Sequence, residues 1–238
     1  AAPADDLLAM HGRIAEGVQK GLLPALGASA GPTGSTPAHD EAYRLYLRSL
    51  ALPKQPKPTE RAIEMLERAV QIEPQFAPAW EALGTRYYDH GMYGGGGEAV
   101  LRRSLPAFRQ ALELDPDLLT AAQRIVTTRT EDGDLEGAYE EARRLLEHFG
   151  PTAQTHFAVA FVYRFGGLYE EAQRHCELAL DRDPHDPRLR SCAYAYLYAG
   201  DLSRVMHFLM LDEGSYFVQW GTVLYSLRRD DRATALHA

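Results

Sequence analysis

The stretch Ala77-Pro-Ala-Trp-Glu-Ala-Leu-Gly84 contains a spacing that recurs along the chain. The residues three, four and seven positions after Trp80 are Leu83, Gly84 and Tyr87. These positions share one face of a helix, because an α-helix has about 3.6 residues per turn. Glycine inside a helix costs about 1 kcal/mol relative to alanine, so Gly84 indicates that a second helix packs closely there.

A second pattern follows each first one: a small residue, a bulky residue four positions on, another small residue, and then proline. It occurs as Ala62, Leu66, Ala69 and Pro74; as Ser104, Phe108, Ala111 and Pro116; as Ala138, Ala142, Leu145 and Gly150, with Pro151 one place late; and as Ala172, Cys176, Ala179 and Pro184. The steps from Pro116 to Gly150 and from Gly150 to Pro184 are both 34 residues, whereas Pro74 to Pro116 is 42, which is one period plus eight residues.

This period of 34 residues, with Trp-x2-Leu-Gly-x2-Tyr, Ala-x3-Phe and Pro, resembles the tetratricopeptide repeat (TPR) family. The resemblance implies an all-α fold, a right-handed helical solenoid of antiparallel helix pairs. Residues 40–238 would form this TPR array, with about five repeats and a terminal half repeat. It also implies that Trp80 is wedged between the helices of its repeat.

Two segments precede the array. Residues 5–26 have the apolar spacing of one amphipathic helix, so residues 1–26 are either the end of a preceding domain or a cap on the array. The helix resembles the last helix of the TolB-like domain found before TPR arrays in some bacterial regulators. Residues 27–39 are rich in Gly, Ser, Thr and Pro and are predicted to be a linker.

Several local departures from the repeat are expected. The first turn, 52–58, is long, and the helix after it is predicted to start at Thr59. The eight extra residues fall around 92–99 and read as a glycine-rich turn; no Gly-Lys-Ser/Thr follows, which argues against a phosphate loop. Pro106 should start its helix late or kink it. A break at 212–215 should shorten the fifth repeat.

Composition excludes some classes of function. The formal charge of −8 does not favour nucleic-acid binding. No apolar run approaches the roughly 20 residues of a membrane span, and the N-terminus lacks the basic region of a signal peptide. The two cysteines, Cys176 and Cys192, cannot make a disulfide framework, so we expect a reducing, cytoplasmic location.

No pattern of catalytic or ligating residues emerges. Neither His-Glu-x-x-His nor Cys-x-x-Cys occurs, and no Gly-x-Ser-x-Gly suggests acyl transfer. Cys176 stands where the repeat requires a bulky apolar residue and is predicted to be a buried thiol. We therefore expect no metal, no cofactor and no enzymatic activity.

The TPR resemblance places the first helix of each repeat on a concave wall that binds partners. Carried over by position, the partner-binding residues are Arg44, Arg48, Glu81, Thr85, Tyr88, Gln123, Thr127, Phe157, Phe161, Arg164, Phe165, Arg188 and Tyr198. Glu81 and Thr85 replace the Lys/Asn clamp by which some TPR adaptors hold a C-terminal carboxylate. Phe157, Phe161 and Phe165 form a stripe four residues apart, which is either groove or core.

Two functions are compatible with these features. The first is a scaffold that binds a partner peptide or protein in the concave groove, as part of a larger bacterial signalling or regulatory protein. There, apolar anchors would insert at the aromatic stripe while Arg164 and Arg188 select acidic flanks. The alternative is a structural module that self-associates into a homo-oligomer.

Overall fold

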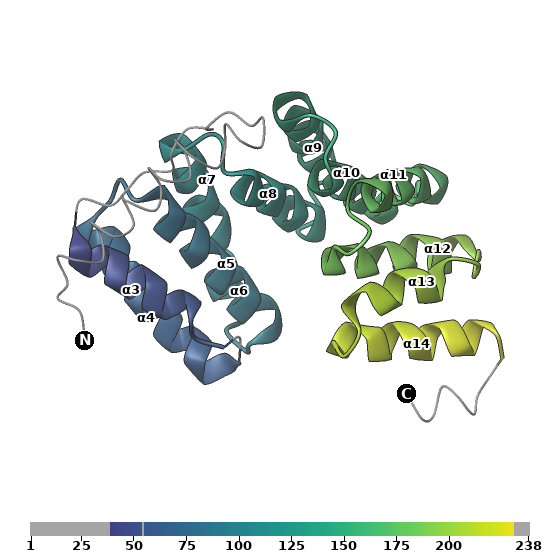
Figure 1. Cartoon of the computed structure of the whole chain (residues 1–238), viewed down its shortest axis with the longest axis horizontal. Helices are drawn as coiled ribbons and strands as arrows, with labels where there is room; N and C mark the ends of the chain where they lie inside the picture. Colours follow the sequence, from purple (N-terminus) through teal and green to yellow (C-terminus); the bar gives the residue numbers. More distant parts are fainter. Residues whose placement is uncertain (1–38, 54, 231–238) are drawn as a thin grey trace, which may run out of the picture. The chain divides into compact units, whose positions relative to one another are not determined.

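The computed structural model describes residues 39–53 and 55–230, and these residues form helices without a strand. Neighbouring helices are joined by short connections and pack side by side within each unit described below (Figure 1). The class is all-α, as predicted. The α-helices are α3 (Asp40–Leu50), α4 (Pro56–Ile72), α5 (Ala77–Tyr93), α6 (Gly97–Leu101), α7 (Ser104–Leu114), α8 (Leu119–Glu131), α9 (Leu135–Phe149), α10 (Ala153–Phe165), α11 (Tyr169–Arg182), α12 (Ala193–Ala199), α13 (Val205–Leu209) and α14 (Tyr216–Arg228), with 3-10 helices η2 (Pro187–Cys192) and η3 (Met210–Asp212).

The chain divides into two compact units at the start of α8, between Ala121 and Ala122. The first contains α3 to α7 and the second contains most of α8 and the helices up to α14. The helix predicted over 5–26 and all but the last residue of the predicted 27–39 linker lie outside the described residues. Those assignments stay predictions.

The core of the first unit explains the glycine in the stretch that defines the repeat. A Cβ atom placed on Gly84 would lie 2.7 Å from two ring atoms of Phe108, a side chain of α7 with no exposed surface. Gly84 therefore lets α5 and α7 approach until the ring covers the helix backbone. The close helix contact predicted from this glycine is confirmed.

The inserted residues of the second repeat form more than a turn. They lengthen α5 to Tyr93 and add the short helix α6. The glycine-rich connection folds over His90: Cβ atoms at Gly94 and Gly96 would lie 2.5 and 2.6 Å from atoms of the His90 ring. These glycines permit a close approach of the loop backbone to a buried side chain.

The two proline-marked helix starts differ in how well they were predicted. Helix α4 begins at Pro56, three residues before the predicted Thr59, because proline suits the first turn of a helix, where the N–H has no intrahelical partner. Pro106 lies in the first turn of α7 for the same reason. Of the two predicted effects of Pro106, a late helix start or a kink, the structure has the late start.

Trp80 does not occupy the predicted wedge. Its side chain is only partly buried at the edge of the first core, and the indole N–H donates to the carbonyl oxygen of Pro74 over 2.9 Å. The turn before α5 offers this carbonyl at the helix start, and the hydrogen bond ties the edge of the indole to that turn. The interior is filled by Leu83, Phe76 and Tyr87 instead.

The two cysteines of the second unit are not thiols. Cys176 on α11 and Cys192 at the end of η2 form a disulfide, with Cα atoms 5.8 Å apart and both residues at most 2% exposed. The prediction of a buried thiol at Cys176 is wrong, because η2 brings the second cysteine against α11. The predicted cytoplasmic location rested on unpaired cysteines and loses that support.

The last helices follow the predicted break. Helix α13 is only five residues long, η3 follows it, and α14 starts after the turn at 213–215. Gly221 of α14 lies against α13, since a Cβ atom there would come 2.3 Å from Leu209. A neighbouring face of α14 carries three exposed apolar side chains, Trp220, Leu224 and Leu227.

Candidate functional site

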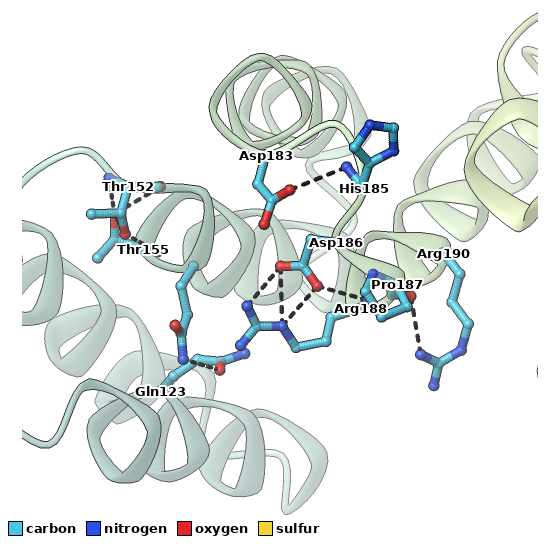
Figure 2. Close-up of polar contacts among 10 residues, drawn as sticks. Gln123, Thr152, Thr155, Asp183, His185, Asp186, Pro187, Arg188 and Arg190 are labelled. Carbon is cyan, nitrogen blue, oxygen red and sulfur yellow. Dashed lines mark hydrogen bonds and ion pairs between the residues drawn. The ribbon is translucent and has the colours of Figure 1, made fainter. Parts of the chain in front are cut away.

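Helix α10 carries the central part of the candidate site, and its ends are fixed by local sequence. Thr152 and Thr155 cap its start reciprocally: each side-chain oxygen accepts from the other residue's backbone N–H, over 3.2 and 2.9 Å (Figure 2). Gly166 and Gly167 end it, and Gly167 has a positive φ of 76°. This turn leaves Phe165 at the exposed end of the helix.

The aromatic stripe of α10 is divided between core and surface. Phe157 and Phe161 are 7% and 8% exposed and belong to the hydrophobic core of the second unit, whereas Phe165 is 46% exposed. A helix that is apolar on more than one side needs a neighbour on each. The second neighbour is η2, which packs on α10 and covers the two inner rings. Of these three rings, only Phe165 exposes a large part of its surface to a partner.

Arg164 lies at the centre of an aromatic group. Its guanidinium carbon is 4.7 Å from the ring centre of Phe161, 4.6 Å from that of Phe165 and 5.6 Å from that of Tyr194. Tyr194 in turn lies 6.2 Å from Tyr198, which is 49% exposed. We call these five residues the Arg164 cluster. It joins the end of α10 to α12.

A shallow hollow lies beside the Arg164 cluster. It encloses about 160 Å³ of empty space, part of it open to solvent. The space leaves no room for a water molecule inside it, so a ligand would lie across the hollow rather than enter it. The hollow is lined by Phe157, Ala160, Phe161, Arg164, Cys176, Ser191, Cys192 and Ala195.

Burial around Arg164 lowers the pKa of its guanidinium, while Tyr198, Glu131 and Tyr194 favour the charged form. Arginine starts from a pKa above 12, so the side chain stays cationic at neutral pH. The cluster therefore combines a partly desolvated positive charge with exposed aromatic carbon.

Arg188, the second arginine expected to select acidic groups, is already neutralised. Its guanidinium contacts the carboxylate of the buried Asp186 through three nitrogen–oxygen pairs of 2.7 to 3.0 Å, as Figure 2 shows. Asp186 also accepts from the backbone N–H of Arg188 and so caps η2. This geometry fixes the start of η2 and takes up most of the charge that Arg188 could offer a ligand.

The other predicted site residues are spread over both units. In the first, Arg44 pairs with Asp40 on the surface, Arg48 is exposed, Glu81 and Thr85 are half-buried, and Tyr88 is buried. In the second, Gln123 and Thr127 are buried on α8, where the Gln154 amide donates to the Gln123 side chain over 3.0 Å. Within the second unit, Gln123 and Thr127 make none of the ring contacts that join Phe161, Phe165 and Tyr198 in the Arg164 cluster.

Sequence reasoning missed two aromatic residues of this region. Tyr194 stands at a position that the repeat reserves for packing, yet its ring lies beside Arg164. Tyr169, at the start of α11, lies 6.0 Å from Tyr198. The spacing of Tyr194 and Tyr198, four residues apart on one helix face, was the available signal for the first.

Two histidines form a second polar feature, between α10 and α11. The Nδ1 atoms of His156 and His175 lie 3.2 Å apart, within hydrogen-bond distance. Burial, then His156 and Arg174, lower the pKa of His175 to about 4, while Glu171 acts in the opposite direction. Burial, then Arg182, also lower the pKa of His156. Both rings are therefore neutral at pH 7.

These histidines should make the second unit sensitive to acid. A folded-state pKa below the unfolded value near 6.5 means that the unfolded chain binds the proton first. The contribution to stability is thus complete above pH 6.5 and lost as the pH falls toward 4. For one buried and one half-buried ring, we expect a loss of about 1–2 kcal/mol over this range.

Urea denaturation at pH 7.0, 5.5 and 4.5 measures this loss. His175→Gln should remove much of the difference between these pH values, whereas His185→Gln, at an exposed loop position, should leave it unchanged. Equal pH dependence in both variants would show that the His156–His175 pair is not its origin.

No family model and no curated protein matches the chain. Solved structures do match it. PilW, a widely conserved type IV pilus biogenesis factor, superposes with a TM-score of 0.60 at 13% identity, over 82% of this chain and 88% of PilW. PilF of Pseudomonas aeruginosa gives 0.56 at 18% identity, over 83% and 87%. A tetratricopeptide repeat protein from Parabacteroides merdae gives 0.54 at 17% identity, over 84% and 77%.

These likenesses define the class of fold. At such identities they establish architecture alone: helix pairs arranged as in tetratricopeptide-repeat structures. No helix between residues 39 and 230 is long and apolar enough to cross a bilayer. Across the same described residues, no group of three or more His, Cys, Asp or Glu side chains is placed to hold a metal ion.

Proposed function

We propose that this chain is a protein-interaction module whose second unit binds a peptide segment of a partner protein at the Arg164 cluster. One observation supports this most: Phe165 and Tyr198 each expose about half of their surface in a cluster that contains a partly desolvated arginine. Aromatic residues and arginine supply most binding hot spots, since they combine large apolar area with directed polar groups. An apolar side chain of the partner would pack on the two exposed rings.

The proposal is tested by removing the exposed rings. After a partner is identified by pull-down, Phe165→Ala and Tyr198→Ala should each weaken its binding by about 30-fold, which corresponds to 2 kcal/mol. Leu50→Ala, at a similarly exposed apolar residue of the first unit, is the matched control. If the two variants fold and bind the partner as tightly as the control, the partner does not bind at the Arg164 cluster.

Self-association remains the second candidate, and a specific surface favours it. Trp220, Leu224 and Leu227 lie on one face of α14 and are 37–54% exposed. Exposed apolar stripes of this kind often mark contacts between proteins. Sedimentation equilibrium over a hundredfold concentration range, with Leu227→Glu for comparison, distinguishes a homo-oligomer from a monomer that binds only foreign partners.

The disulfide bears on where the module works. Disulfides persist in oxidising compartments and are rare in the cytosol. Cys176–Cys192 therefore favours an oxidising compartment over the cytoplasmic location expected from cysteine usage. Two earlier expectations stay predictions. One is that the chain is not an enzyme. The other, that it comes from a bacterial signalling protein with a TolB-like domain, rests on residues 5–26, which lie outside the described residues.

A further inference from the structure

The arginines of the second unit differ in what neutralises them. Arg188 contacts Asp186, Arg190 contacts Asp212 over 3.1 Å, and Arg204 contacts Glu177 over 2.7 Å. Among the described residues, Arg164 forms no such ion pair, and its guanidinium lies against rings instead. Arg164 is thus a partly buried cation whose charge Glu131 helps to stabilise, although no carboxylate among the described residues forms an ion pair with it.

Stacking on rings leaves the hydrogen-bonding edge of a guanidinium available. Its five N–H groups point outward in the plane, whereas the rings contact the face. Burial has already removed part of the water around Arg164, which lowers its pKa and costs solvation energy. A carboxylate at this edge would recover that energy through charge-assisted hydrogen bonds, the stronger kind in proteins.

We propose that the Arg164 cluster recognises an Asp or Glu side chain of the partner segment, placed next to an apolar residue. The carboxylate contacts Arg164 at the hollow, and the apolar neighbour packs on Phe165 and Tyr198. This rests on the proposed function and narrows the acidic selection to Arg164, because Asp186 occupies Arg188.

The acidic group is a side chain rather than a chain terminus for a structural reason. The hollow is shallow and opens to solvent, so a continuous peptide can cross it. Capture of a terminal carboxylate usually employs several converging donors, such as a backbone nest. Here the wall supplies one guanidinium.

The experiment is selection from a phage library of random 12-residue peptides, which carry no free C-terminus. Selection on the whole wild-type chain should enrich Asp or Glu beside an aromatic or aliphatic residue. Arg164→Met keeps an apolar side chain over the rings and should lose only the acidic preference. Arg164→Lys should retain part of it. Arg182→Met removes the same charge from an exposed position of α11 and should leave the selection unchanged.

Synthetic peptides then give magnitudes. In the most enriched peptide, replacing its acidic residue Glu by Gln should weaken binding to the wild-type protein about tenfold or more. The same change in the peptide should weaken binding to the Arg164→Met variant by less than about twofold. Equal losses for both proteins, or apolar enrichment without acidic residues, would overturn the role of Arg164 and leave the interaction module intact. A tenfold preference for free-acid over amidated peptides would assign the anion to the C-terminus instead. Failure to enrich any peptide that depends on Phe165 or Tyr198 would refute the proposed function itself.

Discussion

Phe108→Ala is expected to lower the free energy of unfolding of the first unit by about 3–5 kcal/mol. The ring has no exposed surface and covers the backbone of α5 at Gly84, so its removal leaves a cavity that neighbouring helices cannot easily fill. Urea denaturation monitored by circular dichroism measures the loss.

The control for this variant is the same substitution at an exposed ring. Phe165→Ala should cost less than about 1 kcal/mol, because about half of the surface of this side chain already faces water. Similar costs for the two variants would mean that Phe108 does not seat on Gly84, and the helix register assigned to the first unit would be wrong.

Reduction of the Cys176–Cys192 disulfide is expected to destabilise the second unit by about 3 kcal/mol. The bond closes a loop of 16 residues, and closing a loop of about this length restricts the unfolded chain by that amount. The loop contains the connection from α11 to η2, so reduction also loosens the link that places α12 beside α10. Denaturation with and without dithiothreitol measures the effect.

A Cys176→Ala, Cys192→Ala double variant separates the bond from the reagent. It should have the stability of the reduced protein and should not respond to dithiothreitol. Titration of two free thiols in the denatured, unreduced wild type would show that the bond does not form, and the oxidising compartment would lose its support.

Helix pairing in this protein could be predicted because it depends on spacing within single helices. Gly84 indicated a close helix contact, and in the structure the ring of Phe108 makes that contact. The position of the Trp80 ring could not be predicted in this way. The TPR resemblance placed its ring inside, but a nearby carbonyl at Pro74 holds the indole N–H at the surface.

The candidate site was only partly predictable, because it depends on contacts between repeats. Phe157 and Phe161 became core when η2 packed on α10, and no spacing within α10 indicates that neighbour. The same 3-10 helix brings Cys192 to Cys176. Arg164 and Arg188 were both predicted to select acidic groups. They differ in the structure because Asp186, two residues before Arg188, pairs with it.

The most direct test of binding at the Arg164 cluster is a crosslinking experiment that locates the partner on the chain. A photoreactive benzoylphenylalanine replaces Phe165 in one sample and the exposed Leu178 of α11 in another, and each is irradiated with the partner. The account predicts a crosslinked complex from position 165 that excess unlabelled wild type suppresses, and little or none from position 178. Crosslinking from position 178 alone, or equally from both, would contradict binding at the Arg164 cluster.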